Sequence, residues 1–163
     1  MGIEEINRIK NEFSNLKLHP TYLEHEAVIT SEEAAKTRGF ELKQGIKALL
    51  FTEGKQNYVI VDIPADKKVD QKKVAVAMNW PKGNIRMATP EEVLEKTGCE
   101  IGAVPPFGHK TKIPILVDTQ IYQNKDSAFN IGLRTHSVKI LSEEMKIIFT
   151  KLNVIEGDFV KQD

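Results

Sequence analysis

The fold of this chain is indicated most clearly by two neighbouring runs of residues, Ile46-Lys47-Ala48-Leu49-Leu50-Phe51-Thr52 and Tyr58-Val59-Ile60-Val61-Asp62-Ile63. Both runs are rich in β-branched and aromatic residues, which predicts strands. The five residues between them, 53–57, contain a glycine, as the slightly long loop of a hairpin does. Because both runs are apolar on both faces, we expect this hairpin to lie inside a sheet.

Helices and further strands are predicted on both sides of the hairpin. Apolar residues at intervals of three and four give the N-terminal segment one packing face. Capping patterns place helix starts at Thr30, Asp70 and Thr89, and Ser142 is the predicted N-cap of the last helix. The predicted helices span residues 1–18, 30–39, 69–78, 89–98 and 142–152. The further strands span residues 21–29, 85–88 and 113–118, and residues 127–140 form one or two strands around Gly132.

This order of elements predicts one compact α/β domain of the α+β type over residues 1–163. The sheet is expected to be mixed and largely antiparallel, with helices on its faces. A chain of 163 residues buries roughly 68–70% of the surface that its unfolded form exposes, so it supports a core without disulfides or metals. Residues 153–163 are expected to form a polar tail.

Charge and cysteine content restrict the class of protein. Lys and Arg number 23, as do Asp and Glu, so no long-range field draws in DNA or an anionic membrane, and any nucleic acid must be held locally. The single Cys99 excludes a disulfide framework and a cysteine-based zinc site and fits a reducing compartment. The N-terminus has no signal-peptide pattern, and no apolar run approaches the ~20 residues of a membrane span. We therefore expect a cytoplasmic protein.

The common catalytic motifs are absent from the sequence. No nucleophile elbow, zinc-protease motif, phosphate-binding loop or dinucleotide fingerprint is present. The four histidines share no metal-ligand spacing, and Cys99 follows a predicted helix end, where the helix dipole disfavours a thiolate. We expect no metal and no cofactor.

The loop Gly102-Ala103-Val104-Pro105-Pro106-Phe107-Gly108 is the most informative segment outside the hairpin. Two prolines stiffen its middle, and glycines at both ends allow sharp turns and close approach to a ligand. Such a rim offers backbone N–H groups that can hold a carbonyl oxygen or a ribose hydroxyl. The alternative, a stiff proline turn with no ligand, is equally compatible with the spacing.

Lys47 is a cation at the start of a strand whose same-face neighbours are apolar. One interpretation is a lysine whose stem packs on the sheet while its ammonium reaches water. The other is a positive charge at the mouth of a cleft that binds a phosphate. The residues alone leave both interpretations open.

An ordered set of motifs resembles the YbaK/prolyl-tRNA synthetase editing-domain family. The set comprises Ile46-Lys47-Ala48-Leu49, the Ile101–Gly108 loop, Val117-Asp118, Gly132, and Ser137-Val138-Lys139-Ile140, and His25 and the Thr30–Ala35 segment resemble the opening region of that family. The resemblance covers about residues 20–145. It implies a freestanding trans-editing hydrolase that cleaves the ester of a misacylated tRNA, often tRNA for proline. Water is the implied attacking group, with help from a ribose hydroxyl in several members of the family.

The resemblance also implies partners and site residues. The partner is the aminoacylated 3′ end of a tRNA, with an aminoacyl-tRNA synthetase as a further candidate and neither membrane nor DNA. The implied catalytic residues are Lys47, Gly102 and Gly108, and the implied substrate-binding residues are His25, Pro106, Phe107, Asp118, Asn130, Ile131 and Gly132.

One departure from the family pattern affects specificity. Ile131 stands where many members have a small residue, so an Ile131 side chain in the pocket would narrow it and favour a small amino acid such as alanine. His109 and His136 have no family counterpart and are interpreted as solvated, and His25 either borders the cleft or is a structural histidine. Two other functions compete with deacylation, namely a non-catalytic module that binds a tRNA end or a synthetase, and a hydrolase of other small esters.

Overall fold

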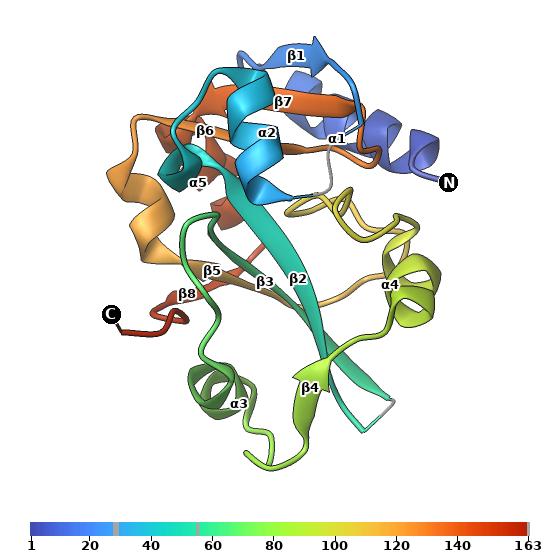
Figure 1. Ribbon diagram of the computed structural model, residues 1–163, viewed down its shortest axis with the longest axis vertical. Coiled ribbons are helices and arrows are strands. Elements are labelled where there is room, and N and C mark those ends of the chain that lie inside the picture. The colour runs from blue at the N-terminus through green and yellow to red at the C-terminus, as the bar shows by residue number, and fades with distance from the viewer. Residues whose placement is uncertain (28–29, 55, 163) are drawn as a thin grey trace.

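The computed structural model describes residues 1–27, 30–54 and 56–162 (Figure 1). Within these ranges the helices are α1 (Ile3–Asn15), α2 (Ser31–Arg38), α3 (Gln71–Met78), α4 (Pro90–Thr97) and α5 (Ser142–Lys151). The strands are β1 (Thr21–Glu24), β2 (Ile46–Glu53), β3 (Asn57–Pro64), β4 (Ile85–Met87), β5 (Ile115–Asp118), β6 (Asp126–Asn130), β7 (His136–Leu141) and β8 (Ile155–Gly157).

The strands form two sheets, whereas the sequence predicted one. The larger has the order β4-β2-β3-β5-β8, with β2 antiparallel to β3 and with β5 parallel to both β3 and β8. The smaller has the order β1-β7-β6 and is antiparallel throughout. The two sheets meet at one isolated bridge between Gly45 and Ala128 and do not merge into a continuous ladder. The predicted hairpin of β2 and β3 is confirmed, and it lies inside the larger sheet.

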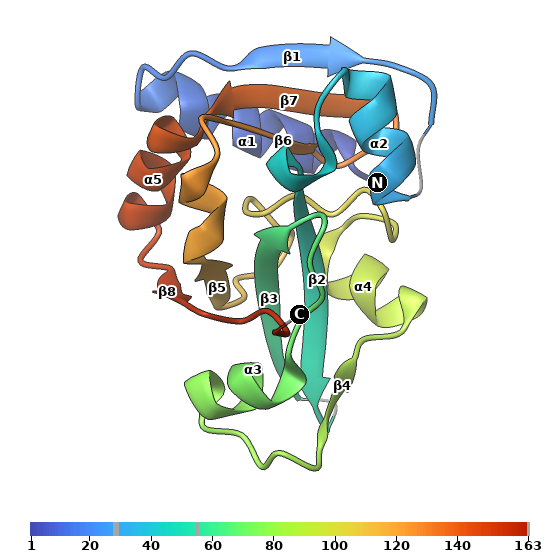
Figure 2. The same ribbon diagram turned by 60° about the vertical axis from the view of Figure 1, so that its left-hand side comes forward.

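Helices α1 and α5 cover the smaller sheet (Figure 2). Their apolar faces share one core with that sheet, as the periodicity over α1 predicted. Residues of this core that are at most 2% exposed include Ile9, Phe13, Phe107, Phe129, Val138, Met145, Ile148 and Phe149. The α3 side of the larger sheet has a second core, built around Phe51, Val61, Val74 and Leu116.

Three of the four predicted caps are confirmed. Thr30, Asp70 and Thr89 each accept hydrogen bonds from the first turn of the helix that follows them. The prediction for Ser142 is wrong by one residue, because Leu141 is the N-cap and makes no side-chain cap. The Ser142 hydroxyl instead lies 2.7 Å from that of Ser127, in the interior.

Residues 153–163 differ from the polar tail that their composition suggested. They include β8, which pairs with β5, and two side chains, Phe159 and Val160, that are each 4% exposed. Because these few apolar residues stand among polar ones, the mean hydropathy of the segment did not indicate that it packs on the domain. In the extended segment predicted over 21–29, β1 covers residues 21–24, and residues 28–29 lie outside the described ranges. No helix in the described part of the chain is long and apolar enough to cross a bilayer.

Candidate functional site

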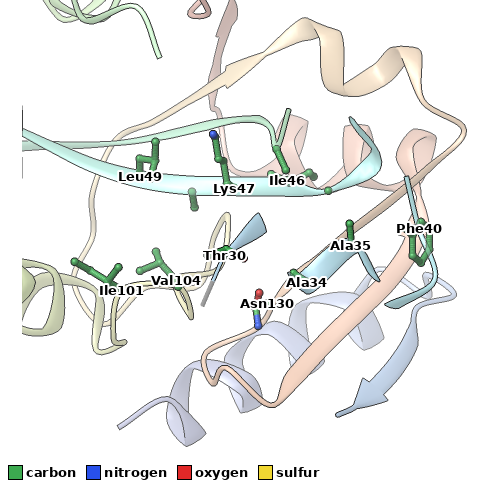
Figure 3. A pocket seen from close by; sticks show the side chains of 14 residues that line it. Thr30, Ala34, Ala35, Phe40, Ile46, Lys47, Leu49, Ile101, Val104 and Asn130 are labelled. Carbon is green, nitrogen blue, oxygen red and sulfur yellow. The ribbon is translucent and has the colours of Figure 1, made fainter. Parts of the chain in front are cut away.

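A small cavity of about 160 Å³ lies between α2, the start of β2, the loop after α4 and the end of β6 (Figure 3). Most of its lining is apolar and small, including Ala34, Ala35, Ala48 and Ala65. The polar side chains among the described lining residues are Thr30, Lys47 and Asn130. Four segments that are far apart in sequence thus enclose a space that suits a small, mostly apolar group.

The cavity lies along an open edge of β2. Strand β4 pairs with β2 over Phe51–Glu53, and the Ala88 N–H donates to the Leu50 carbonyl, so this ladder ends before the cavity begins. Backbone groups alternate in direction along a strand. The N–H and C=O of Ala48 therefore point to the same side as those of Leu50, toward the cavity. Sequence analysis missed this feature, because nothing local to β2 indicates where its neighbouring strand ends.

The loop after α4 forms the opposite wall. Gly102 lines the cavity with φ +85°, a left-handed conformation that glycine adopts without strain. The Ala103 N–H donates to the Glu100 carbonyl. The N–H groups of Gly102 and Val104 donate to no described acceptor. Two backbone donors at this wall are therefore available to a bound oxygen.

Three side chains clamp this loop through its carbonyl groups. Arg134 donates to the Ile101 carbonyl from Nε (2.9 Å) and Nη2 (2.7 Å), and Arg8 Nε donates to the Gly108 carbonyl at 3.0 Å. His109 Nε2 donates to the Pro105 carbonyl at 2.7 Å. The interpretation of His109 as a solvated residue is wrong: burial, with Arg8 nearby, lowers the pKa of His109 to about 4. These clamps add to the stiffness that the prolines predicted.

Lys47 lines the cavity, but its side chain is directed elsewhere. Figure 3 shows Lys47 and Leu49 leaving β2 on one side, while Asn130 and Val104 lie on the other side of the strand. Burial lowers the pKa of Lys47, the nearby carboxylates of Glu32 and Asp66 oppose that shift, and the Lys68 ammonium adds to it. The ammonium has no carboxylate within 4 Å in the described part of the chain. The Lys47 ammonium is therefore better placed to bind a ligand group at the rim of the cavity than one at its centre.

Thr30 and Asn130 provide polar atoms on the cavity wall. The Thr30 hydroxyl accepts from the Glu33 N–H at 3.1 Å and donates to the Glu33 carboxylate at 2.9 Å. Asn130 is 9% exposed, and its side-chain amide donates to the Leu133 carbonyl at 3.2 Å. Asn130 was expected at the site from the resemblance, whereas Thr30 was expected as a helix cap within a segment that resembles the family and not as a site residue.

Several of the proposed site residues lie in the interior beyond the cavity wall. Phe107 is fully buried and packs edge-on against Phe13, with ring centroids 5.6 Å apart, and its neighbour Pro106 is also buried. Asp118 is fully buried and accepts from the N–H groups of Gln120 (2.9 Å) and Phe159 (2.8 Å). None of these side chains lines the cavity in the described structure.

His25 and His136 lie at the smaller sheet. The two ring nitrogens of His25 are 2.7 Å from the Ser137 hydroxyl and 2.7 Å from the Glu26 carbonyl oxygen. His136 Nε2 is 3.1 Å from Glu24, so this residue is bonded rather than simply solvated. Neither histidine is among the described residues that line the cavity. Of the two interpretations of His25, these contacts favour the structural one.

Ile131, Gly132 and Gly108 face the core and α1. Ile131 is 1% exposed within the core, so it does not narrow the cavity as anticipated. Successive side chains of an extended chain point in opposite directions, and Asn130 takes the cavity side. A Cβ on Gly132 (φ +128°) would come 2.5 Å from the carbonyl oxygen of Gly2, the N-cap of α1, and one on Gly108 (φ +83°) would come 2.9 Å from Ile9 Cγ1 in α1.

Cys99 and metal-binding side chains add no further chemistry in the described part of the chain. Cys99 is buried, and desolvation raises its pKa to about 12, which suppresses the thiolate. Within the described residues, no three His, Cys, Asp or Glu side chains are placed to hold a metal ion. Chemistry at the cavity therefore depends on backbone donors, a rim lysine and whatever the bound molecule supplies.

Known proteins resemble this chain in sequence and in fold. A model of the aminoacyl-tRNA editing domain matches residues 25–147. A relative from Escherichia coli K12, the multifunctional Ser/Thr-tRNA deacylase ProXp-y, is 35% identical over 118 residues, which are 70% of each chain. Proline–tRNA ligase from Thermosipho melanesiensis is 32% identical over 99 residues, which are 61% of this chain and 17% of the ligase. The crystal structure of a candidate trans-editing enzyme for prolyl tRNA synthetase superposes with a TM-score of 0.79 at 25% identity, over 97% of this chain and 98% of the other.

Proposed function

This chain belongs to the aminoacyl-tRNA editing domain family and is an aminoacyl-tRNA deacylase, and we propose that it hydrolyses esters of small amino acids on tRNA for proline. The observation that carries the proposal is the cavity of about 160 Å³, which is walled by alanines and flanked by available backbone donors. Water adds to the ester carbonyl, the bond to the ribose oxygen breaks, and the products are the free amino acid and the tRNA hydroxyl.

Backbone donors supply the electrostatic part of this mechanism. The Gly102 and Val104 amides lie at the wall where the ester carbonyl would sit, and the clamped loop holds them in place before substrate arrives. One well-placed oxyanion donor typically contributes 10²–10³-fold in rate. An aminoacyl ester is already activated, so this contribution does not require a side-chain nucleophile. The Thr30 hydroxyl, which lines the cavity, is engaged in capping α2.

Lys47 has a binding role in this proposal. Its ammonium extends from β2 at the rim and away from the apolar floor, so it suits a backbone phosphate near the 3′ end of the tRNA rather than the scissile carbonyl. Gly102 and Asn130 are assigned to the wall that receives the aminoacyl group. Gly108, Phe107, Pro106, Asp118, Ile131 and Gly132 then act by shaping the structure behind that wall.

The size of the cavity limits the amino acid. Ala34, Ala35 and Ala48 leave room for a side chain of a few atoms and suit alanine best. Because the relative from Escherichia coli is a Ser/Thr-tRNA deacylase, serine and threonine esters are included among the substrates to be tested. A synthetase that delivers the mischarged tRNA is a further proposed partner.

Deacylation assays test this function. The wild type is incubated with tRNA for proline charged with alanine, serine, threonine or proline, and with a second tRNA charged with alanine. We expect cleavage of the small non-cognate esters and little cleavage of the proline ester. Absence of cleavage on every substrate would contradict the proposal and favour a non-catalytic binding module.

Two alanine variants, one at Lys47 and one at a control lysine, test the role of Lys47. We expect Lys47→Ala to lower kcat/KM about 10- to 100-fold, the usual range for loss of one hydrogen bond to a charged group. Lys43→Ala is the matched control, because Lys43 is exposed, near the same end of β2 and paired with Glu41 at 3.5 Å. Equal activity of both variants would remove Lys47 from the mechanism.

A further inference from the structure

The charge of this neutral chain is unevenly distributed. Residues 66–86 contain six Lys or Arg and two Asp, a net charge of +4, so the rest of the chain has a net charge of −4. This segment is the connection from β3 through α3 to β4. A concentrated basic segment on a neutral protein is the local grip that nucleic-acid binding requires.

Tertiary contacts bring three separate parts of the chain into one basic hollow. Lys72 of α3, Lys82 of the turn after α3 and Lys161 near the C-terminus line the same depression in the surface. All three side chains are exposed, and none has a carboxylate within 4 Å in the described part of the chain. Asp70 also lines the hollow, but its carboxylate accepts from the N–H groups of Lys72 (3.0 Å) and Lys73 (3.3 Å). Among the described lining residues three lysines thus face one carboxylate, so the hollow has an excess of positive charge.

Residues 66–86 run from the rim of the cavity to the hollow. Ala65 lines the cavity, and the chain then descends from that end of β3 to α3, as Figures 1 and 2 show. Lys68 lies on this path, close enough to Lys47 to lower its pKa, and the Lys68 carbonyl accepts from the Lys161 N–H at 2.9 Å. Lysines thus recur from Lys47 through Lys68 to the hollow, with the Asp66 carboxylate among them.

The pairing of β2 with β4 gives the distance between the cavity and the Ile85 end of the hollow. The cavity lies at the Ile46 end of β2, whereas Ile85, which lines the hollow, is paired with Glu53 at the other end. Seven strand steps of roughly 3.3 Å separate these ends by about 23 Å. A strand that is stacked as in a helix has a phosphate about every 3.4 Å along its axis, so about seven stacked nucleotides span this distance. That is more than the single-stranded 3′ end of a tRNA contains, so a stacked strand that starts in the cavity would meet the Ile85 end of the hollow with its paired stem.

From this arrangement we propose that Lys72, Lys82 and Lys161 form a binding surface for backbone phosphates of the tRNA acceptor stem, with Lys68 linking it to the cavity. The inference rests on the proposed function, because it takes the terminal ester to be in the cavity. It goes beyond that function by assigning recognition of the stem to a surface made by α3 and the C-terminal segment.

A pair of triple variants tests the surface. Lys72→Gln, Lys82→Gln and Lys161→Gln are combined in one protein, and Lys110→Gln, Lys112→Gln and Lys125→Gln in a control that removes the same charge from three exposed lysines outside the segment. The kcat/KM for aminoacyl-tRNA is measured between 50 and 200 mM salt. The same measurement is made with an aminoacylated CCA trinucleotide, which has no stem.

We expect the first triple variant to lose at least tenfold in kcat/KM on aminoacyl-tRNA and to show a salt slope shallower by about 2–3, since each lost contact with duplex phosphate removes about 0.9. Its activity on the trinucleotide should equal that of the wild type, and the control triple variant should match the wild type on both substrates. Equal effects of the two triple variants, or an equal loss on the trinucleotide, would overturn the proposal.

Binding of uncharged tRNA separates this proposal from the proposed function. If the wild type cleaves neither the aminoacyl-tRNA nor the aminoacylated trinucleotide, the proposed function fails. Weaker tRNA binding by the first triple variant alone would still support the surface, and unchanged binding would refute it.

Discussion

The loop after α4 has two faces that use the same backbone conformation for different purposes. On one face Gly102, with φ +85°, lines the cavity. On the other, Gly98 (φ +81°) and Gly108 (φ +83°) lie against α1, where a Cβ would come 2.6 Å from Glu5 Oε2 and 2.9 Å from Ile9 Cγ1. A glycine with positive φ therefore indicates a required turn, and only its surroundings indicate whether a ligand or a helix occupies the adjacent space.

Gly132→Ala is expected to give the largest loss of stability, at a glycine between β6 and β7 that also lies against the start of α1. The substitution combines an unfavourable φ of +128° with a Cβ that lies 2.5 Å from the Gly2 carbonyl oxygen. Backbone strain and overpacking together should lower the free energy of unfolding by about 4 kcal/mol, measured by urea denaturation.

Gly39→Ala is the matched control for that substitution. Gly39 has φ +74° with nothing within 4 Å of its added Cβ, so only the backbone cost of about 1–2 kcal/mol applies. Equal losses in the two variants would show that close contact with the start of α1 adds nothing to the cost of a Cβ at a glycine with positive φ.

His109, which is bonded to the Pro105 carbonyl of this loop, should make stability depend on pH. Its pKa in the folded protein is about 4, below the 6.5 of an ordinary histidine, so the unfolded chain binds more protons between these values. The free energy of unfolding should therefore fall as pH drops from about 6.5 to about 4.

The variant His109→Gln isolates this contribution, because glutamine can still donate to the Pro105 carbonyl. Between pH 7 and pH 4.5 the wild type should lose about 2–3 kcal/mol more unfolding free energy than the variant does, at about 1.36 kcal/mol per pKa unit. Parallel pH profiles for the two proteins would mean that His109 is not buried as a neutral ring.

Val104→Ala tests the cavity side, where the smallest loss of stability is expected. The side chain is half-buried and borders the cavity, so its truncation should cost about 1 kcal/mol in unfolding free energy. The cavity becomes wider, and the relative kcat/KM for larger aminoacyl esters should rise about tenfold. An unchanged preference, measured by competing alanine and threonine esters, would place the amino-acid side chain elsewhere.

Sequence reasoning found part of the candidate site because some of its signals are local. Lys47 and Gly102 lie in a strand start and a glycine–proline loop, and both line the cavity with Asn130. The clamps from Arg8 and Arg134 were missed, since each crosses to the loop from a distant element. Ile131 was expected to narrow the cavity, but its direction depends on where the chain leaves β6.

The amino-acid sequence by itself determined the helices, the central hairpin and the stiff loop, because periodicity, capping and proline act over a few residues. Tertiary structure alone decided that there are two sheets, that β2 has an open edge, and which glycines border a cavity rather than α1. It also decided that Lys161 joins Lys72 and Lys82. The physical reason is that such proximities arise from packing between segments that are far apart along the chain, which no short-range pattern specifies.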